Sequence, residues 1–379
     1  MTIGILGGGQ LGYMLALAGY PLGLHFRFLD PSPQAPVGRV APRITAEYTD
    51  REALEKFIAG LACVTYEFEN VPVETARKLN ERVPVYPPPQ ALEAAQDRLN
   101  EKTLFQRLGI ATTEFAEVDS PKNLDAAVER IGLPAILKTR RMGYDGKGQW
   151  VLRTPEAVAS LRKDFPKSKL ILEKFVPFER ELSILAVRSR NGEEVFYPLV
   201  ENHHREGILR LSLAPAPHLD PKIESTAIEA ARRVMATLDY VGVLAIELFE
   251  CSGQLLANEM APRVHNSGHW TIEGAVTSQF ENHLRAISGF PLGSTAAQGH
   301  SAMINLIGEV PDSGELLAVQ DAHLHLYGKA LRPGRKVGHV TVRAATSQQL
   351  AARLAALPSF FHRPEFCLEA TLAKSSKSI

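Results

Sequence analysis

Residues 257–269 read ANEMAPRVHNSGH and concentrate side chains that could bind or polarise an anionic ligand. The polar members of this block are Asn258, Glu259, Arg263, His265, Asn266, Ser267 and His269. Upstream, Glu247 is a single carboxylate within the apolar run GVLAIELF. Two acids at the ends of adjacent strands supply the hard oxygen ligands that suit Mg²⁺ bridging phosphates. The pattern indicates a magnesium–nucleotide site facing an anionic substrate; the alternative is a hairpin followed by a solvated loop.

A glycine-rich segment near the start of the chain, GGGQLG at 7–12, follows an apolar strand, opens a helix and precedes Asp30. This matches the dinucleotide pattern, in which glycines let the backbone approach a pyrophosphate at a helix N-terminus. The alternative is a tight strand-to-helix turn that binds no dinucleotide. We favour the turn, because no second half of a doubly wound cofactor domain precedes the prolines at 87–89 and nucleotide chemistry lies elsewhere.

A second glycine-rich segment, MGYDGKGQ at 142–149, is predicted to be a mobile loop between two strands. Its backbone N–H groups and Lys147 could close over a polyphosphate. It is not a Walker A loop, since the G-K-[ST] ending is absent. Lys138 ends the preceding apolar strand, where a lysine is costly to bury without an anion such as a nucleotide phosphate. The alternative for the loop is a solvated hairpin turn.

Two acids on separate predicted strands, Glu173 and Glu181, could complete a nucleotide site. The backbone of residues 174–176 could bind adenine, and Glu181 could bind ribose hydroxyls. Taken as isolated residues, both acids fit an exposed surface charge better than a site. A zinc pair at His203 and His204 is disfavoured, because adjacent strand residues point to opposite faces.

Basic residues cluster near a turn late in the chain, at Lys329, Arg332, Arg335 and Lys336. They suit a phosphate clamp, since forked Arg and flexible Lys both bind phosphate. The alternative is a basic surface hairpin.

Bulk composition limits the class of protein. The 379 residues carry 42 basic and 42 acidic side chains, which favours neither nucleic acid nor an anionic membrane as a partner. Three separated cysteines form no disulfide framework or CxxC metal site, so we expect a cytoplasmic protein. We find no signal peptide and no apolar run near the ~20 residues of a membrane span.

Hydrophobic periodicity then predicts the elements that position these groups. Strands alternate with helices up to the prolines at 87–89, which indicates an α/β domain over residues 1–90. We place a mixed domain at 91–300 and a β-rich C-terminal domain at 301–379. Among the individual elements, the pattern predicts one helical stretch over Pro89–Leu108, a strand over Val195–Val200 and a hairpin of Val241–Phe249 with Gln254–Glu259.

Taken together, the chain resembles the ATP-grasp superfamily and, within it, the N5-carboxyaminoimidazole ribonucleotide synthases. The similarity covers residues 2 to about 345 and lies in GGGQLG, YEFENVP, QDR at 96–98, GYDGKGQ, LEKFVPFERELS, ANEMAPRVHNSGH and RPGRKVGH. It implies an ATP-grasp architecture of α/β and α+β class: a Rossmann-like pre-ATP-grasp domain, a central ATP-grasp domain with a mobile lid subdomain at about 110–180, and a small β-rich C-terminal domain. One departure is Tyr13, where a basic or small residue is expected.

The resemblance also implies roles for individual residues. ATP would be bound by Arg98, Lys138, Gly143, Tyr144, Asp145, Gly146, Lys147, Gly148, Gln149, Glu173, Lys174, Phe175, Val176, Glu181, His204, Asn258 and Glu259. Mg²⁺ would be bound by Glu247 and Glu259. The ribonucleotide would contact Gln10, Glu69, Tyr144, Arg263, His265, Asn266, Ser267, His269, Lys329, Arg335 and Lys336. The catalytic residues would be Arg263, His265 and Lys138.

The implied activity is ATP-dependent carboxylation of 5-aminoimidazole ribonucleotide by bicarbonate, through carboxyphosphate, in purine biosynthesis. The family resemblance also implies a homodimer. The alternatives are another ATP-grasp acylphosphate ligase, such as a formate-dependent glycinamide ribonucleotide transformylase or a biotin carboxylase, and an NAD(P)-dependent oxidoreductase that uses GGGQLG.

Overall fold

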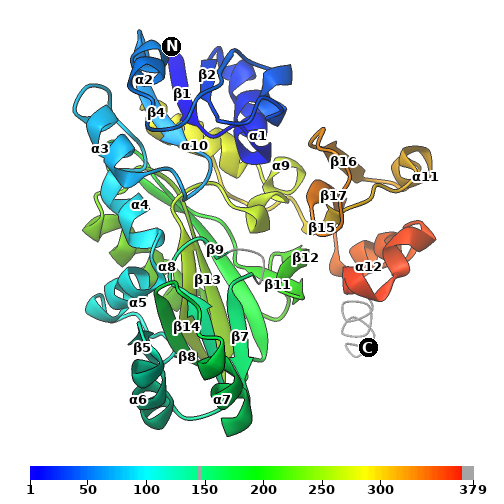
Figure 1. Ribbon diagram of the computed structural model, residues 1–379. Helices are drawn as coiled ribbons and strands as arrows, with labels where there is room; N and C mark the ends of the chain where they lie inside the picture. Colours follow the sequence, from blue (N-terminus) through cyan, green and yellow to red (C-terminus); the bar gives the residue numbers. More distant parts are fainter. Residues whose placement is uncertain (144–146, 369–379) are drawn as a thin grey trace.

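The computed structural model describes residues 1–143 and 147–368, which form three sheets with their covering helices (Figure 1). The N-terminal sheet is parallel, in the order β3-β2-β1-β4. Its strands and helices are β1 (Thr2–Leu6), α1 (Gln10–Gly19), β2 (His25–Leu29), β3 (Arg43–Ile44), α2 (Arg51–Ile58), β4 (Cys63–Tyr66) and α3 (Val73–Asn80). The predicted α/β start of the chain is therefore confirmed.

A nine-stranded sheet forms the centre of the molecule, in the order β14-β13-β9-β11-β12-β15-β17-β16, with β10 beside β9. Its strands are β9 (Arg180–Arg188), β10 (Glu194–Phe196), β11 (Val200–Arg205), β12 (Ile208–Ala214), β13 (Gly242–Cys251), β14 (Gln254–Ala261), β15 (His300–Ile307), β16 (Ala322–Leu326) and β17 (Lys336–Ala344). All of its strand pairs are antiparallel. The predicted β13–β14 hairpin is confirmed.

Two apolar cores lie on opposite faces of this sheet. Helix α8 (Pro221–Thr237) covers the face that carries Ile184 and Ile246, whereas α10 (Gln279–Ser288) covers the face that carries Leu185 and Ala245. The faces differ because successive side chains of a strand point to opposite sides. The α10 face is continuous with the core under α1, so the N-terminal domain and the central sheet share one apolar cluster.

A third sheet, β5-β8-β6-β7, is also antiparallel and packs against α6 and α7. Its elements are β5 (Phe115–Val118), α6 (Pro121–Ile131), β6 (Ala135–Thr139), β7 (Gln149–Leu152), α7 (Pro155–Lys163) and β8 (Leu170–Lys174). The remaining helices are α4 (Pro89–Ala95), α5 (Arg98–Arg107), α9 (Thr271–Gly274), α11 (Ser313–Leu317) and α12 (Ser347–Ala355).

Two predicted elements are wrong. The stretch Pro89–Leu108 is two helices, α4 and α5, because Asp97 leaves the helical conformation and its side chain accepts a hydrogen bond from Leu99 N, as an N-cap does. The predicted strand Val195–Val200 instead spans the end of β10 and the start of β11. Pro198 lies between them and cannot donate to a strand ladder.

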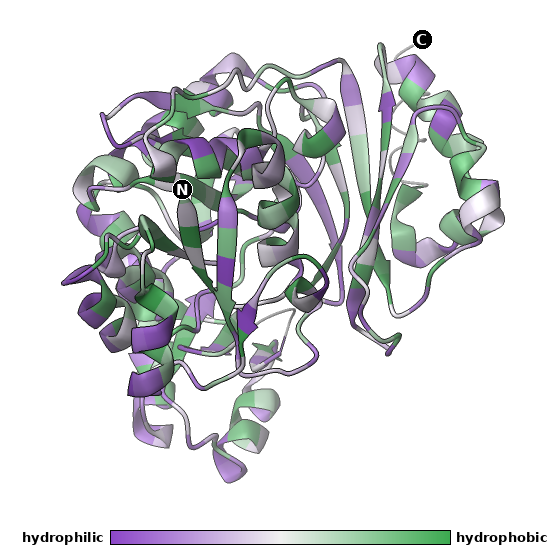
Figure 2. Cartoon of the chain, turned by 90° about the horizontal axis from the view of Figure 1, so that it is seen from above, coloured by the Kyte–Doolittle hydropathy of each residue, from purple (hydrophilic) through white to green (hydrophobic). Residues whose placement is uncertain are grey.

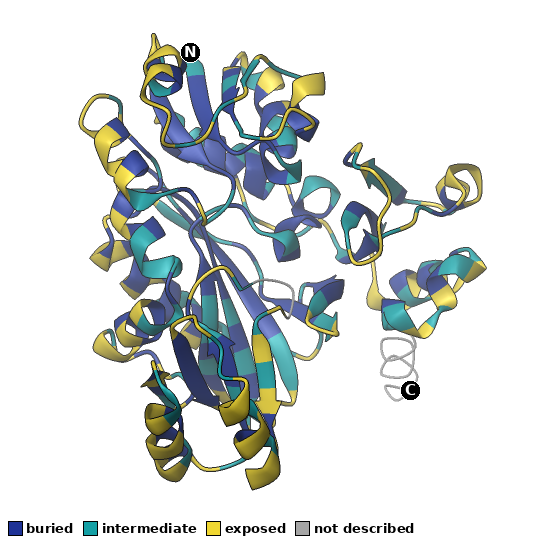
Figure 3. Cartoon of the chain, viewed as in Figure 1, coloured by how far each residue is buried: buried dark blue, intermediate teal, exposed yellow. Residues whose placement is uncertain are grey.

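Burial follows these layers. Buried residues follow the strands, while exposed residues mark the outer helix faces (Figure 3), and the helices alternate hydrophilic and hydrophobic segments (Figure 2). Among the described residues, no helix is both long and apolar enough to cross a membrane.

Candidate active site

A cavity of about 650 Å³ lies where the N-terminal domain, the central sheet and the third sheet meet. The structure brings a large part of the predicted site to its wall: Gln10, Glu69, Arg98, Lys138, Gly143, Gln149, Glu181, His204, Glu247, Asn258, Glu259, Arg263, His265, Asn266 and Lys336. These residues come from segments separated by up to more than three hundred positions, from Gln10 to Lys336, so only the fold makes them neighbours. Tyr144, Asp145 and Gly146 lie outside the described residues.

The two predicted metal acids face each other across the β13–β14 hairpin, where Glu247 and Glu259 are direct cross-strand partners. The register shifts immediately afterwards, because Leu248 pairs with Ala257 and Asn258 is the extra residue of a bulge. Bulges re-aim side chains next to active sites. Here Asn258 and Glu259 both line the cavity although they are sequence neighbours.

The electrostatics of this pair fit a cation. Burial and the neighbouring Glu259 carboxylate raise the pKa of Glu247. Asn258 Oδ1 is buried and has no hydrogen-bond partner among the described residues. Two carboxylates and a spare amide oxygen are the donors that Mg²⁺ accepts, with phosphate oxygens and water completing its octahedron. The described residues hold no group of three or more His, Cys, Asp or Glu side chains placed to bind a metal ion.

A second acid is held by cations. Glu173 is buried, and its Oε2 lies 2.8 Å from Lys138 Nζ and 3.5 Å from Lys102 Nζ. Burial opposes its charge, but the ammonium groups of Lys102 and Lys138 outweigh burial and lower the pKa of Glu173 to about 2. Sequence reasoning gave Lys102 no role, since a lysine on a helix is ordinarily solvent-exposed.

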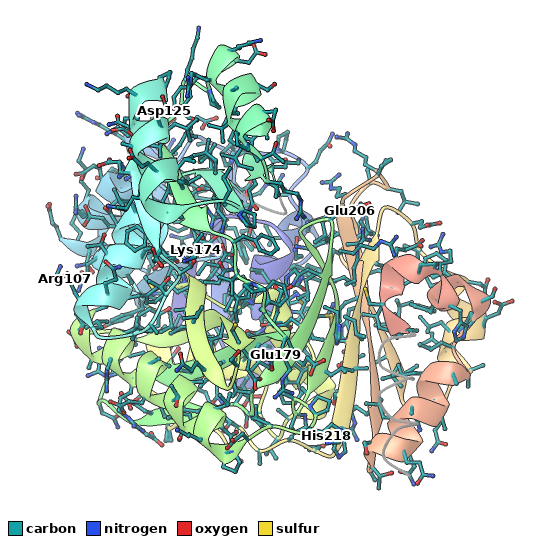
Figure 4. The ribbon with its side chains drawn as sticks, turned by 90° about the horizontal axis from the view of Figure 1, so that it is seen from below. Arg107, Asp125, Lys174, Glu179, Glu206 and His218 are labelled. Carbon is teal, nitrogen blue, oxygen red and sulfur yellow. The ribbon has the colours of Figure 1, made fainter. Side chains whose placement is uncertain are left out.

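Of the other residues predicted to bind the nucleotide, some line the cavity and some do not. His204 Nδ1 lies 3.0 Å from Glu181 Oε2, so this predicted pair is in contact at the cavity wall. Lys174 ends β8 (Figure 4) and pairs with Glu114. Glu173, Lys174, Phe175, Val176, Lys147 and Gly148 do not line the cavity. Arg98 Nη1 lies 2.7 Å from Glu259 Oε2.

On the substrate side, Arg263 reaches Glu69, with 2.5 Å between Arg263 Nη2 and Glu69 Oε1. Arg263 Nε and both side-chain amide atoms of Asn266 are buried without a hydrogen-bond partner among the described residues. Buried polar groups are rarely left unpaired in native proteins. Their gathering at one wall therefore indicates a ligand rich in donors and acceptors.

Two predicted substrate residues lie behind this wall. His269 is fully buried, with its ring centroid 4.8 Å from that of His339, and Ser267 is fully buried against Ser183. Neither lines the cavity. Direct contact of these two residues with a substrate stays a prediction.

The basic cluster is split as well. Lys336 lines the cavity, and Lys329 donates a hydrogen bond to the amide oxygen of Gln10. Arg335 is partly exposed, bonds Ala330 O at 3.4 Å and does not line the cavity. Tyr13 packs against the apolar core beneath α1 and is likewise absent from the lining.

The backbone amides of the GGGQLG segment, at the N-terminus of α1, bind carboxylates of the protein itself. Gly9 N and Gly12 N donate to the two carboxylate oxygens of Glu67, at 2.5 and 2.8 Å, and Gly8 N donates to Asp30 Oδ2 at 2.7 Å. A dinucleotide phosphate would need these amides. The side chain of Glu67 already occupies the place of that phosphate, so the dinucleotide interpretation fails, as the sequence analysis favoured.

Comparison with known proteins gives three matching family models. They are the ribonucleotide synthetase preATP-grasp domain at residues 1–96, the ATP-grasp domain at 103–280 and the phosphoribosylaminoimidazole carboxylase C-terminal domain at 301–353. The N5-carboxyaminoimidazole ribonucleotide synthase of Pseudomonas aeruginosa is 56% identical over 94% of this chain and 98% of its own length.

Solved structures agree. The N5-carboxyaminoimidazole ribonucleotide synthetase of Thermus thermophilus is 62% identical, with a TM-score of 0.90 over 93% of this chain and 97% of its own. An Aspergillus clavatus N5-carboxyaminoimidazole synthase, solved with ADP and 5-aminoimidazole ribonucleotide, is 30% identical, with a TM-score of 0.87 over 98% of both chains.

Proposed function

The chain belongs to the N5-carboxyaminoimidazole ribonucleotide synthase family of ATP-grasp ligases, and we propose how its cavity performs that family's reaction. The protein is an ATP-dependent carbon–nitrogen ligase that carboxylates 5-aminoimidazole ribonucleotide with bicarbonate, forming N5-carboxyaminoimidazole ribonucleotide, ADP and phosphate. The observation that carries the proposal is the single cavity in which the Glu247–Glu259 pair faces Arg263 and His265.

The reaction has two group transfers. A bicarbonate oxygen attacks the γ-phosphorus of ATP, the bond to the β-phosphate oxygen breaks, and ADP leaves with that electron pair. The exocyclic amine nitrogen then bonds to the carboxyl carbon of carboxyphosphate, or of the CO₂ released from it. The carbon–oxygen bond to phosphate breaks, and the amine loses one proton. Phosphoryl transfer of this kind depends on positioning and charge neutralisation more than on covalent protein chemistry.

We assign the metal and nucleotide end of the cavity to residues of four strands, β6, β9, β13 and β14. Glu247, Glu259 and the oxygen of Asn258 would hold Mg²⁺, which would neutralise the phosphates. Lys138 would bind phosphate oxygens, and Glu181 would bind ribose hydroxyls. The buried Lys102–Glu173–Lys138 row would keep the adenine end rigid.

At the other end, Arg263 would hold bicarbonate or the new carboxylate, and Gln10 and Asn266 would orient the ribonucleotide. Lys329 and Lys336, with Arg335 after a local movement, would bind its 5′-phosphate. Closure of the lid subdomain would exclude water from carboxyphosphate, which is easily hydrolysed. We further propose a homodimeric cytoplasmic enzyme with domain boundaries near residues 90 and 300.

The test is phosphate release from ATP with bicarbonate and Mg²⁺, measured with and without 5-aminoimidazole ribonucleotide, together with detection of the carboxylated product. We expect the ribonucleotide to stimulate phosphate release. Stimulation by glycinamide ribonucleotide with formate, and not by 5-aminoimidazole ribonucleotide, would assign the site to the other acylphosphate ligases instead.

A further inference from the structure

A buried hydrogen-bond chain of polar side chains runs across neighbouring strands on one face of the central sheet and ends at His265. Ser212 on β12 donates to Asn202 Oδ1 on β11 at 2.7 Å, and Asn202 Nδ2 donates to Ser183 Oγ on β9 at 2.9 Å. Ser183 Oγ donates to Ser267 Oγ at 2.8 Å. Ser267 Oγ in turn lies 2.9 Å from His265 Nδ1. This hydrogen-bond chain lies on the same sheet face as Glu247, since Ser183 and Glu247 are cross-strand partners.

One bond in this chain fixes the direction of the others. The backbone N–H of Ser267 points at His265 Nδ1, with 3.3 Å between the nitrogens. A backbone N–H can only donate, so Nδ1 must carry a lone pair there. In a neutral imidazole one nitrogen accepts and the other carries the proton. The ring proton therefore lies on Nε2.

The side-chain hydroxyls fit this direction. Each hydroxyl has one proton to donate. Ser183 gives its proton to Ser267, which leaves the Ser267 proton for His265 Nδ1. With the bonds from Ser212 and Asn202, every donor along the chain points toward the histidine.

The surroundings hold the ring in place. Ser183, Ser212 and Ser267 are fully buried and Asn202 is 4% exposed, so breaking the chain would leave unpaired polar groups in the core. The backbone of His265 is also clamped, because its N–H donates to Gln279 Oε1 at 2.9 Å and its C=O accepts from Gln279 Nε2 at 2.7 Å. Nε2 then faces the cavity, 3.2 Å from Glu247 Oε1.

We propose that this chain locks His265 as the neutral Nε2–H tautomer, so that His265 is a fixed hydrogen-bond donor in the carboxylation and not its general base. This inference rests on the proposed function for the identity of the acceptor. The acceptor is a carboxyl oxygen of carboxyphosphate or of CO₂, on which negative charge grows as the amine nitrogen bonds to carbon. Ser267, Ser183, Asn202 and Ser212 are positioning residues that act through the ring.

The physical basis is the cost of the alternative. Nε2 already bears a proton and cannot accept one from the amine, and Nδ1 faces two donors and no base. A preorganised neutral donor aimed at developing charge needs no rearrangement during the reaction, which is how oxyanion-stabilising groups act. The proton that the amine loses must leave to another group, and the phosphate released in the same step can accept it.

The direct test is spectroscopic and needs no activity. The full-length enzyme is labelled with ¹⁵N-histidine, and two-bond ¹H–¹⁵N correlations report which ring nitrogen of each histidine carries the proton. His265 is identified by the signals that disappear in His265→Gln. We expect the Nε2–H pattern for His265; an Nδ1–H pattern or a doubly protonated ring overturns the proposal.

The kinetic test uses side chains that imitate one ring nitrogen at a time. The amide of Gln reaches the position of Nε2 and can donate there, whereas the amide of Asn reaches only that of Nδ1. We expect His265→Gln to keep kcat within about tenfold of wild type, a difference that corresponds to one hydrogen bond. We expect His265→Asn and His265→Ala to lower kcat further. Equal loss in all three variants contradicts a donor role.

Cutting the chain tests the positioning residues. Ser267→Ala should lower kcat by about tenfold and Ser183→Ala by less, with the KM for ATP unchanged, because the lost bond orients the ring rather than the nucleotide. Ser267→Thr, which keeps the hydroxyl, should recover part of the loss. Ser301→Ala is the matched control, since Ser301 is a buried serine of the same sheet outside the chain. An equal fall in kcat for the control would show that the effect is general packing.

The two proposals can fail separately. If 5-aminoimidazole ribonucleotide fails to stimulate phosphate release in the wild-type enzyme, the proposed function is wrong, while the tautomer measured by resonance stands. If stimulation occurs and the tautomer is Nδ1–H, only the inference about His265 is wrong.

Discussion

Two regions of this molecule look equally suited to an anionic ligand, and they differ in whether their polar atoms are already paired. At the start of α1, the backbone amides of Gly8, Gly9 and Gly12 donate to carboxylates of the chain itself. In the cavity beside β13 and β14, polar atoms of Asn258 and Asn266 are buried with no partner among the described residues.

The difference shows how a structural anion-binding motif is told from a functional one. Both regions have donors, burial and backbone geometry that fit an anion, so residue types alone do not separate them. A buried polar group left unpaired costs about 1–3 kcal/mol, and such atoms persist where a ligand will pair them. The carboxylates at the α1 N-terminus therefore hold the fold together, and the cavity is where we propose that the ligands bind.

The largest effect that this comparison predicts concerns Glu259. Glu259→Gln removes a metal charge but keeps the size of the side chain, so we expect turnover to fall by roughly a thousandfold or more with the fold intact, as for loss of a group that stabilises transferring phosphate. Phosphate release with all substrates at saturation measures it. Near wild-type turnover would show that the metal assignment is wrong.

A matched control for this variant is Glu129→Gln, at an exposed acid of α6 that does not line the cavity. Its turnover should equal that of wild type. Titration of Mg²⁺ adds a second criterion, because only the Glu259 variant should need a higher concentration for half-maximal activity.

Glu67 offers the converse test at the other region. Glu67→Ala removes the acceptor of the buried Gly12 amide and of the partly buried Gly9 amide, so we expect a loss of about 3 kcal/mol in the free energy of unfolding, measured by urea denaturation. The KM for the ribonucleotide should rise, because the turn that carries Gln10 loses its anchor. Glu47→Ala, an exposed acid of the same domain, should change stability by less than about 0.5 kcal/mol. A similarly small loss for Glu67→Ala would contradict the structural role of its carboxylate.

Much of this arrangement could be predicted from the sequence, because local patterns carry it. The alternating β13–β14 hairpin and the block at 257–269 place Glu247 and Glu259 together whenever the hairpin forms. The glycine loop and the α/β start are local in the same way. What the hairpin does not predict is the bulge that turns Asn258 into the cavity, since a one-residue shift in register depends on packing.

The long-range contacts lay beyond sequence reasoning for a different reason. Glu67 meets Gly9 and Gly12 across more than fifty positions, and Lys102 looks like any lysine of a surface helix. Ser183, Asn202 and Ser212 are ordinary polar residues of strands until the register aligns them. Strand β15 was also missed, although its run between two glycines, Gly299 and Gly308, was a usable signal.

A smaller effect concerns His283, which joins the N-terminal sheet to the central sheet. Its Nε2 bonds Thr65 on β4 at 3.0 Å, and its Nδ1 accepts from Val243 N on β13 at 3.1 Å. Burial lowers the pKa of His283 to about 3. Above about pH 6.5 neither the folded nor the unfolded chain binds this proton; between 6.5 and 3 only the unfolded chain does, so stability must fall as the pH falls.

The measurement is the free energy of unfolding between pH 8 and 5 in wild type and in His283→Asn, which keeps an acceptor for Val243 N but does not titrate. The variant should be less stable at pH 8, because the Thr65 bond is lost. Below about pH 6.5 its stability should fall less steeply than that of wild type, by up to about 1.4 kcal/mol per pH unit. Parallel curves for wild type and His283→Asn would show that this histidine is not the group that couples stability to pH.

The smallest predicted effect is that NADH does not bind at α1. Both amides that would receive its pyrophosphate, Gly9 N and Gly12 N, are bonded to Glu67, and a phosphate would have to displace a carboxylate that is itself largely buried. Titrating the wild-type protein with NADH should therefore leave the nicotinamide fluorescence as it is in buffer. In Glu67→Ala the amides are free, and added sulfate should restore up to about 1 kcal/mol of stability to the variant beyond any gain in wild type. If NADH binds to the wild type, and binds equally well to Glu67→Ala, then pairing of the amides does not decide which region holds a ligand. If sulfate stabilises only the variant, pairing of the amides does decide it, because the two proteins differ in whether the protein itself supplies the anion.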